Sequence, residues 1–219
     1  MNSTLKINWK KTLKNVSFII LILKMCLVFG QRKIIIIDAG HGGKDSGAVG
    51  INSIKEKDVV LNIAKELLKL NKIILDNAFD MYLTRYKDTL FSLSDRSRLA
   101  KILGADLYVS LHCNASQTTS KGMEIYLHNS ESQNTKASIA LGLSILNLTT
   151  KKLGFKLRGI KFNDFQVLRE TIAYCPSILI ELGFVTQTDE ADYFVKPQNI
   201  KAMALAILMG LYNYINMEL

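Results

Sequence analysis

Four consecutive isoleucines, residues 34–37, run directly into an acid, a histidine and three glycines within residues 38–43. A strand that is half exposed alternates apolar and polar residues, whereas a strand buried on both faces is a continuous run of branched apolar residues. Such strands belong mostly to parallel sheets that carry helices on both faces. The run therefore predicts a buried strand over residues 33–37 of an α/β fold, ending where the polar residues begin.

The rest of the chain alternates short apolar runs with amphipathic segments, a pattern typical of α/β folds. Five further strands are predicted over residues 81–84, 107–111, 123–127, 166–168 and 177–181. Helices are predicted over residues 58–70, 134–153 and 198–217, with one more that Ser94 begins and Gly104 ends. The 219 residues, of which 48% are hydrophobic, can bury a full core. We expect a single α/β domain with a mostly parallel, twisted sheet of about six strands and helices on both faces.

The N-terminal segment differs from the rest of the chain in charge and hydropathy. Residues 1–30 contain five lysines and no acid. Four lysines come first, followed by an apolar run over residues 16–29 that Lys24 interrupts, and then by Gly30. This order is typical of a signal peptide, whereas a bilayer span needs about 20 apolar residues. We expect residues 1–30 to be a signal peptide or, if uncleaved, an N-terminal membrane anchor, and residues 31–219 to be one folded domain.

The net charge and the cysteine positions bear on whether the chain binds nucleic acid and whether it forms a disulfide. The chain has a net charge of +9, but the five N-terminal lysines leave only +4 for residues 31–219, so nucleic acid is not indicated as a partner. Cys113 follows one predicted strand and Cys175 precedes another, which places the two thiols at opposite ends of a parallel sheet. We therefore expect both to be free, packed thiols rather than a disulfide.

Residues of metal-ligand type stand at the ends of the predicted strands. His41 follows the first strand, His112 follows the third and Glu181 ends the last, while Glu56 begins the first helix of the domain. Two histidines and one carboxylate match the ligand number of a catalytic zinc site, and a second carboxylate could act as the base. Each residue alone is equally compatible with a structural role. Phosphate-binding loops, serine elbows and H-E-x-x-H helices are not found in the sequence.

Six motifs follow one another in a characteristic order: "IIIIDAGHGGKDSGAVG", "KEKDVVLNIA", "LTRYKDTLFSLSDRSRLAK", "LYVSLHCNAS", "GMEIYL" and "VLRETIAYCPSILIELGFVTQTDEADYF". Through them the chain resembles the zinc-dependent N-acetylmuramoyl-L-alanine amidases of bacterial cell-wall turnover, over residues 33–215. Two residues depart from the usual pattern, because Ala39 stands where the family often has proline and Cys113 where it often has alanine. Neither position is a presumed ligand.

The resemblance implies that residues 31–219 are a catalytic amidase domain with zinc as cofactor. It also implies Glu181 as the catalytic carboxylate and three zinc ligands: His41, Glu56 and His112. The implied reaction is hydrolysis of the amide between the lactyl group of N-acetylmuramic acid and L-alanine in peptidoglycan, by an exported protein of the periplasm or cell envelope. Asp38 is a candidate acceptor for a ligand imidazole N–H. Arg158 and Arg169 are candidates for binding stem-peptide carboxylates, although structural roles are equally open.

Two alternatives remain, a zinc peptidase or deacetylase acting on cell-wall material and a catalytically inactive cell-wall binding module. Regulation is a separate question, because some members of the family carry an extra helix before the last strand that covers the zinc until an activator displaces it. Here the predicted core elements fill residues 112–181. We therefore expect an open groove, activity without a protein activator, and contact with a membrane only through an uncleaved N-terminal segment.

Overall fold

A computed structural model describes residues 14, 16–19 and 32–217, and its larger compact unit contains one six-stranded sheet. The strands are β1 (Lys33–Ala39), β2 (Phe79–Leu83), β3 (Leu107–Asn114), β4 (Met123–Leu127), β5 (Leu157–Phe162) and β6 (Ser177–Phe184). They lie in the order β2-β1-β3-β6-β4-β5. The first four of these run parallel, β4 is antiparallel to β6, and β5 is parallel to β4. The predicted mostly parallel sheet is confirmed.

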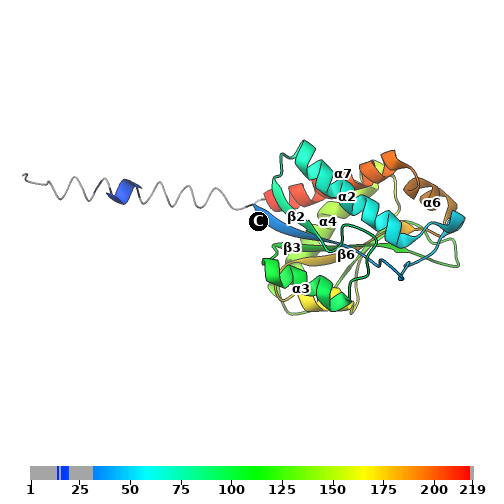
Figure 1. The fold of residues 1–219 in the computed structure, drawn as a ribbon, viewed down its shortest axis with the longest axis horizontal. Coiled ribbons are helices and arrows are strands. Elements are labelled where there is room, and N and C mark those ends of the chain that lie inside the picture. Colours follow the sequence, from blue (N-terminus) through cyan, green and yellow to red (C-terminus); the bar gives the residue numbers. More distant parts are fainter. Residues whose placement is uncertain (1–13, 15, 20–31, 218–219) are drawn as a thin grey trace, which may run out of the picture. The chain divides into compact units, whose positions relative to one another are not determined.

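Helices cover both faces of this sheet (Figure 1). The helical segments are η1 (Ile51–Ser53), α2 (Glu56–Ile74), α3 (Leu93–Leu103), α4 (Gln133–Leu153), α5 (Gln166–Thr171), α6 (Thr188–Phe194) and α7 (Pro197–Asn216). Helices α2, α4 and α7 pack together on one face, and α3 and α5 pack together on the other. Successive β1 side chains alternate between the two cores, because Ile35 and Ile37 join the first and Ile36 joins the second. This double burial explains the unbroken apolar run.

The prediction for one strand was wrong. Residues 166–168 begin helix α5, and the missing strand is β5, which the sequence analysis did not assign. A three-residue apolar run cannot distinguish a strand from a buried helical turn. Strand β5 lacks an apolar run because it lies at the sheet edge, where Leu157 and Phe162 are each more than half exposed.

The start of α3 also differs slightly from the expectation. Ser92, rather than Ser94, caps the helix, since its Oγ accepts a hydrogen bond of 3.1 Å from the backbone nitrogen of Asp95. Gly104 ends the helix with a φ of 61°, as predicted. Within this helix, Arg96 contacts Asp38 and Ala39 at the carboxyl end of β1.

Both cysteines within the described residues are buried and free, as predicted. Cys113 lies at the carboxyl end of β3, whereas Cys175 precedes the start of the neighbouring strand β6. Burial raises the pKa of the Cys175 thiol to about 11, so this group stays protonated at neutral pH.

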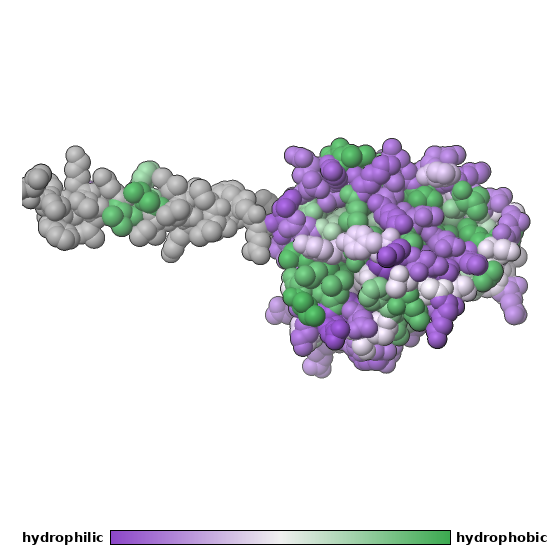
Figure 2. All heavy atoms as spheres, viewed as in Figure 1, coloured by the Kyte–Doolittle hydropathy of each residue, from purple (hydrophilic) through white to green (hydrophobic). Residues whose placement is uncertain are grey.

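The predicted N-terminal leader, residues 1–30, lies largely outside the described residues. Within the described part of the chain, no helix has both the length and the hydropathy that crossing a bilayer requires. On the face of the larger unit seen in Figure 2, hydrophilic residues cover most of the surface and apolar residues form separate patches.

Candidate active site

The carboxyl ends of β1, β3 and β6 meet at one edge of the sheet, which brings distant parts of the sequence together. Ala39 of β1 pairs with Leu111 of β3, and His112 of β3 pairs with Glu181 of β6. In parallel sheets this edge is where ligands commonly bind, because the loops that follow the strands begin there. His41 lies in the loop after β1, and Glu56 starts helix α2 beside it.

His41 occupies a tight turn and contacts carboxylates through both ring nitrogens. Its φ of 60° lies in the left-handed region, which costs a non-glycine residue roughly 1–2 kcal/mol. The Nδ1 atom lies 2.8 Å from Oδ2 of Asp45, and the Nε2 atom lies 3.0 Å from Oε1 of Glu56. Asp45 is itself held by the backbone N–H of Gly47, at 3.0 Å. The ring is therefore oriented from two sides.

Glu56 is buried at the centre of the cluster. Its Oε1 atom lies 2.9 Å from Nδ1 of His112 and accepts a 2.9 Å hydrogen bond from the backbone nitrogen of Cys113. Its Oε2 atom accepts a 2.8 Å hydrogen bond from the backbone nitrogen of Ala48. The carboxylate is thus fixed by one backbone donor from the end of β3 and one from the loop that precedes α2, and both imidazole rings converge on one of its oxygens.

These contacts shift the pKa values of the cluster. Burial alone would raise the pKa of Glu56, but hydrogen bonds from His112 and His41 outweigh it and hold the pKa of this carboxyl far below its usual range. Burial alone would lower the pKa of His41, but the hydrogen bonds and charges of Glu56 and Asp45 outweigh it and raise this pKa to about 8. The pocket is therefore electrostatically arranged to hold positive charge.

The three side chains fit a metal ion. One nitrogen from each of His41 and His112 and one oxygen of Glu56 lie within 4.8 Å of one another. Two imidazoles and a carboxylate leave one tetrahedral position for water, as in catalytic zinc sites. Asp45 provides the carboxylate that ligand histidines commonly contact through their second nitrogen. A Cβ at Gly47 would collide with both His41 and Glu56, so the glycine keeps this space open.

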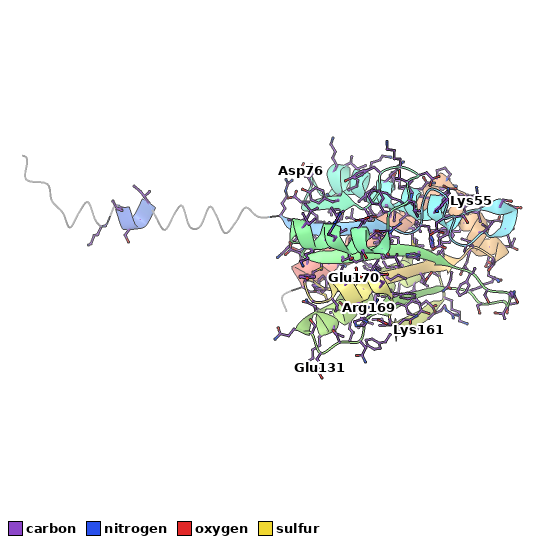
Figure 3. All side chains as sticks on the ribbon, turned by 60° about the horizontal axis from the view of Figure 1, so that its bottom comes forward. Lys55, Asp76, Glu131, Lys161, Arg169 and Glu170 are labelled. Atoms are coloured by element: carbon purple, nitrogen blue, oxygen red, sulfur yellow. The ribbon has the colours of Figure 1, made fainter. Side chains whose placement is uncertain are left out.

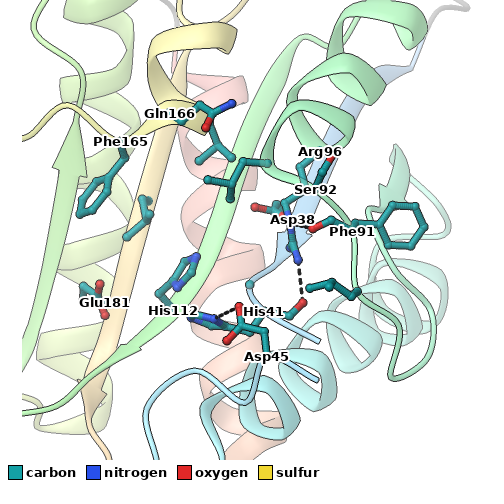
Figure 4. Close-up of a pocket in the computed structure, with 15 residues that line it drawn as sticks. Asp38, His41, Asp45, Phe91, Ser92, Arg96, His112, Phe165, Gln166 and Glu181 are labelled. Carbon is teal, nitrogen blue, oxygen red and sulfur yellow. Dashed lines mark hydrogen bonds and ion pairs between the residues drawn. The ribbon is translucent and has the colours of Figure 1, made fainter. Parts of the chain in front are cut away.

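Glu181 lies across the pocket from this cluster (Figure 4). Within the described part of the chain, its Oε2 atom is one of the few buried side-chain oxygens without a hydrogen-bond partner. Burial raises the pKa of Glu181 to about 7, with the negative charges of Glu56 and Glu124 adding to the effect and His112 opposing it. A carboxyl with this pKa can both accept and release a proton near neutral pH.

The structure contradicts the expectation for Asp38. This buried carboxylate accepts hydrogen bonds from Arg96, Thr84, Tyr108 and Ser110, rather than from a ligand imidazole. Because Asp38 is still within strand β1, its side chain points to the α3 side of the sheet, where it pairs with Arg96. Asp45, rather than Asp38, contacts the Nδ1 atom of His41. The only signal for this contact in the sequence is that Asp45 comes four residues after His41.

The two candidate arginines are paired with acids of the protein itself. Nε of Arg158 and Nζ of Lys161 each lie 2.6 Å from Oε2 of Glu124, a buried residue that the sequence analysis did not single out. Arg169 is on the exposed side of α5 (Figure 3), and its Nη1 atom lies 2.7 Å from Oδ1 of Asp164. Burial would raise the pKa of Glu124, but the hydrogen bonds of Lys161 and Arg158 outweigh it and lower this pKa to about 2.

A pocket of about 630 Å³ opens above His41, His112 and Glu181. The segment before α3 forms one wall and the start of α5 forms the other, as the positions of Phe91 and Phe165 show in Figure 4. Both walls are largely apolar, with side chains from Leu90, Phe91, Leu93, Phe165 and Val167. Leu179 of β6 also lines the pocket. The site therefore combines a polar floor with apolar sides.

Comparisons with known proteins agree on one family. A family model described as N-acetylmuramoyl-L-alanine amidase, Amidase_3, matches residues 35–213. The endolysin of Bacillus phage SPP1 is 38% identical over 192 residues, which cover 86% of this chain and 68% of the endolysin. The amidase LytC of Bacillus subtilis is 36% identical over 183 residues, which cover 82% of this chain and 35% of LytC. The crystal structure of an N-acetylmuramoyl-L-alanine amidase from Clostridium difficile 630 superposes with a TM-score of 0.78 at 33% identity, covering 86% of this chain and all of that one. The protein therefore belongs to the Amidase_3 family of N-acetylmuramoyl-L-alanine amidases.

Proposed function

We propose that this amidase cleaves peptidoglycan with one zinc ion and one proton-carrying carboxylate. His41, Glu56 and His112 would hold the zinc, and Glu181 would be the catalytic residue. The observation that carries the proposal is the arrangement of these four side chains, with three ligand atoms within 4.8 Å and a partnerless buried oxygen of Glu181 in the same pocket. The bond that breaks joins the lactyl carbonyl of N-acetylmuramic acid to the nitrogen of L-alanine.

When bound, zinc supplies a Lewis acid that polarises the scissile carbonyl and makes the attacking water more acidic. Glu181 takes a proton from that water at its unpaired Oε2 atom and delivers it to the departing nitrogen of L-alanine. A carboxylate then remains on the lactyl group, and a free amine remains on the stem peptide. Asp45 accepts the Nδ1–H of His41, which leaves the Nε2 lone pair free on the side of Glu56.

The shape of the pocket suits a chain of sugars bearing peptides. The wall formed by Leu90, Phe91 and Leu93 ends in exposed side chains, so the substrate can extend beyond the floor along this wall. The apolar faces of sugar rings and the methyl groups of lactyl and alanyl units match such walls. Peptidoglycan is therefore the partner, and the net charge gives no reason to add nucleic acid.

Activity should not require a protein activator. Two helices lie between His112 and Glu181 in the sequence. Helix α4 packs on α7, on the face of the sheet opposite to α3 and the pocket. Helix α5 contributes residues to one wall of the pocket and does not cover it. The side chains of His41 and His112 keep about a fifth of their surface exposed. One relative, CwlD from Clostridioides difficile, was solved in complex with the GerS lipoprotein, at 25% identity and a TM-score of 0.75. Strong stimulation of the purified chain by such a partner would contradict the proposal.

The substrate of a cell-wall amidase lies outside the cytoplasmic membrane, so the protein acts in the cell envelope. We assign residues 1–30 to export, because their basic and then apolar sequence has the pattern of a signal peptide. N-terminal sequencing of the protein isolated from cells tests this assignment. A mature chain beginning near Gln31 is expected, and a chain that retains residues 1–30 would indicate an anchor.

Mass spectrometry of digested peptidoglycan tests the reaction itself. An amidase releases intact stem peptides whose first residue is L-alanine with a free amine, and it leaves N-acetylmuramic acid with its lactyl carboxylate. Peptides cut at internal bonds would indicate a peptidase, and loss of acetyl groups from the sugars would indicate a deacetylase. Peptidoglycan that is bound but unchanged would indicate a binding module.

A further inference from the structure

Two buried arginines beside the metal cluster have no part in the mechanism above. Arg85 and Arg96 are 2% and 3% exposed; Arg85 lies just after β2, and Arg96 lies in the first turn of α3. Burying a guanidinium is costly unless its donors are satisfied, so its hydrogen-bond acceptors show what the residue holds in place. For both arginines, these acceptors lie next to the proposed zinc ligands.

Arg85 links the turn of His41 to the first turn of α2. Its Nε atom donates to the carbonyl of Ala39 at 2.9 Å, and its Nη2 atom donates to two carbonyls, that of Gly40 at 2.8 Å and that of Lys57 at 2.7 Å. Gly40 immediately precedes His41, and Lys57 immediately follows Glu56. A single nitrogen therefore connects the neighbours of two proposed ligands that lie 15 positions apart in the sequence.

Arg96 holds the same turn from the other side. Its Nη2 atom donates to the carbonyl of His41 itself at 2.6 Å (Figure 4). Its Nη1 atom donates to the carbonyl of Ala39 at 2.7 Å. The same Nη1 atom lies 2.7 Å from Oδ1 of Asp38, which balances its charge. The left-handed conformation of His41 is unfavourable by itself, so it persists only where the surroundings hold it.

We propose that Arg85 and Arg96 are positioning residues that organise the zinc site before the metal binds. Arg85 sets the spacing between His41 and Glu56, and Arg96 holds the turn that carries His41. The proposal rests on the zinc site proposed above. The planar fork of a guanidinium can donate in several fixed directions at once, whereas a lysine ammonium on a flexible stem cannot reproduce this geometry. The charge alone is therefore not sufficient, and the shape of the side chain is what the site requires.

The test uses the variants Arg85→Lys and Arg96→Lys in the full chain. Each variant keeps the positive charge of the side chain but removes the planar guanidinium. Zinc affinity is measured by competition with a chromophoric chelator, and the absorption spectrum of bound cobalt reports the geometry of the ligands. Removing partners that orient metal ligands typically weakens metal binding by about 10–100-fold. We expect a loss of this size in each variant, together with a changed cobalt spectrum, while thermal unfolding of the metal-free protein remains cooperative.

A matched control separates positioning from general stability. Asn71 is buried in the same helix as Glu56, and its side chain donates to the carbonyl of Phe79 at 2.9 Å, far from the ligands along α2. Asn71→Ala should lower the thermal stability and leave the zinc affinity and cobalt spectrum unchanged.

The possible outcomes distinguish this proposal from the proposed function. If the wild-type chain binds no zinc, the metal site itself is wrong. If the wild type binds zinc and both lysine variants bind it equally well with the same cobalt spectrum, only the positioning role is wrong. Failure of both lysine variants to fold would also contradict the proposal, because the arginines would then act through global stability.

Discussion

Two glutamates on neighbouring strands have different roles because their side chains have different hydrogen-bond partners. Glu124 of β4 and Glu181 of β6 are directly opposite each other across an antiparallel pair. Glu124 accepts hydrogen bonds from Asn114, Tyr126, Arg158 and Lys161, which lower its pKa to about 2. Glu181 has a buried oxygen without a partner and a pKa raised to about 7 by burial. The comparison indicates that a fully paired carboxylate supports structure, whereas an unpaired one facing a pocket is available for proton transfer.

Replacing each glutamate by glutamine should produce the largest contrast. Glu181→Gln keeps the size of the side chain but removes the base, so turnover should fall about 10²–10⁴-fold while zinc affinity is retained. Glu124→Gln removes a charge that does not take part in proton transfer, and its turnover should stay within about tenfold of the wild type. Steady-state kinetics on soluble peptidoglycan fragments, with zinc content measured in parallel, checks both. Similar losses in the two variants would remove the distinction between them.

The next effect concerns the histidine that Asp45 orients. Asp45→Asn keeps a side chain of similar size but replaces the carboxylate that accepts the Nδ1–H of His41. We expect zinc affinity to fall by about 10–100-fold, with binding restored at higher zinc concentration. Chelator competition measures the change, and Asp164→Asn, which alters an exposed partner of Arg169, is the control. Because the amide oxygen of asparagine can still accept the Nδ1–H, an unchanged affinity in Asp45→Asn would mean that the negative charge of Asp45 is not needed to orient His41.

The smallest expected effect is on the stability of the metal-free protein, which should depend on pH in opposite ways through Glu124 and Glu181. The folded-state pKa of Glu124 is about 2, below its ordinary value of 4.5, so its contribution to stability is present above pH 4.5 and is lost as the pH falls toward 2. The folded-state pKa of Glu181 is about 7, above 4.5, so its contribution is present below pH 4.5 and is lost as the pH rises toward 7.

Denaturant unfolding of the wild type and the two glutamine variants tests these opposite signs. Relative to the wild type, Glu124→Gln should lose most stability at neutral pH and less near pH 2. Glu181→Gln should instead gain stability at pH 7 and little at pH 4.5, because glutamine does not have to be buried as a charge. If both variants show the same sign at neutral pH, the two environments do not differ as described.

The sequence predicted those features that follow from the hydrophobic pattern of a single strand or from the residues at the end of a strand. The buried run of β1 predicted a parallel sheet, and the residues just beyond the strands predicted that His41, His112 and Glu181 would lie near one another. Strand β5 was missed because an edge strand with exposed apolar residues has no buried pattern. Sequence periodicity describes one element at a time, so it cannot show which polar groups of different elements meet.

The polar partners of the site were missed for that reason. Arg85 contacts carbonyls that lie 28 to 46 positions before it in the chain, and Glu124 meets Arg158 across 34 positions. Neither contact leaves a periodic signal in the sequence. Asp38 was assigned the wrong role because sequence distance suggested proximity to His41, whereas its place in β1 directs the side chain toward Arg96.

Removing the metal and adding it back tests whether the three proposed ligands hold a zinc ion that cleavage requires. Because the ligands must lose protons to bind zinc, a site of His41, Glu56 and His112 should release its metal to a strong chelator and recover it on zinc addition. Peptidoglycan cleavage and elemental analysis are measured on the same samples. We predict one zinc per chain, loss of cleavage when zinc is removed, and recovery when zinc is restored. Full cleavage by protein that elemental analysis shows to be free of metal would contradict the account.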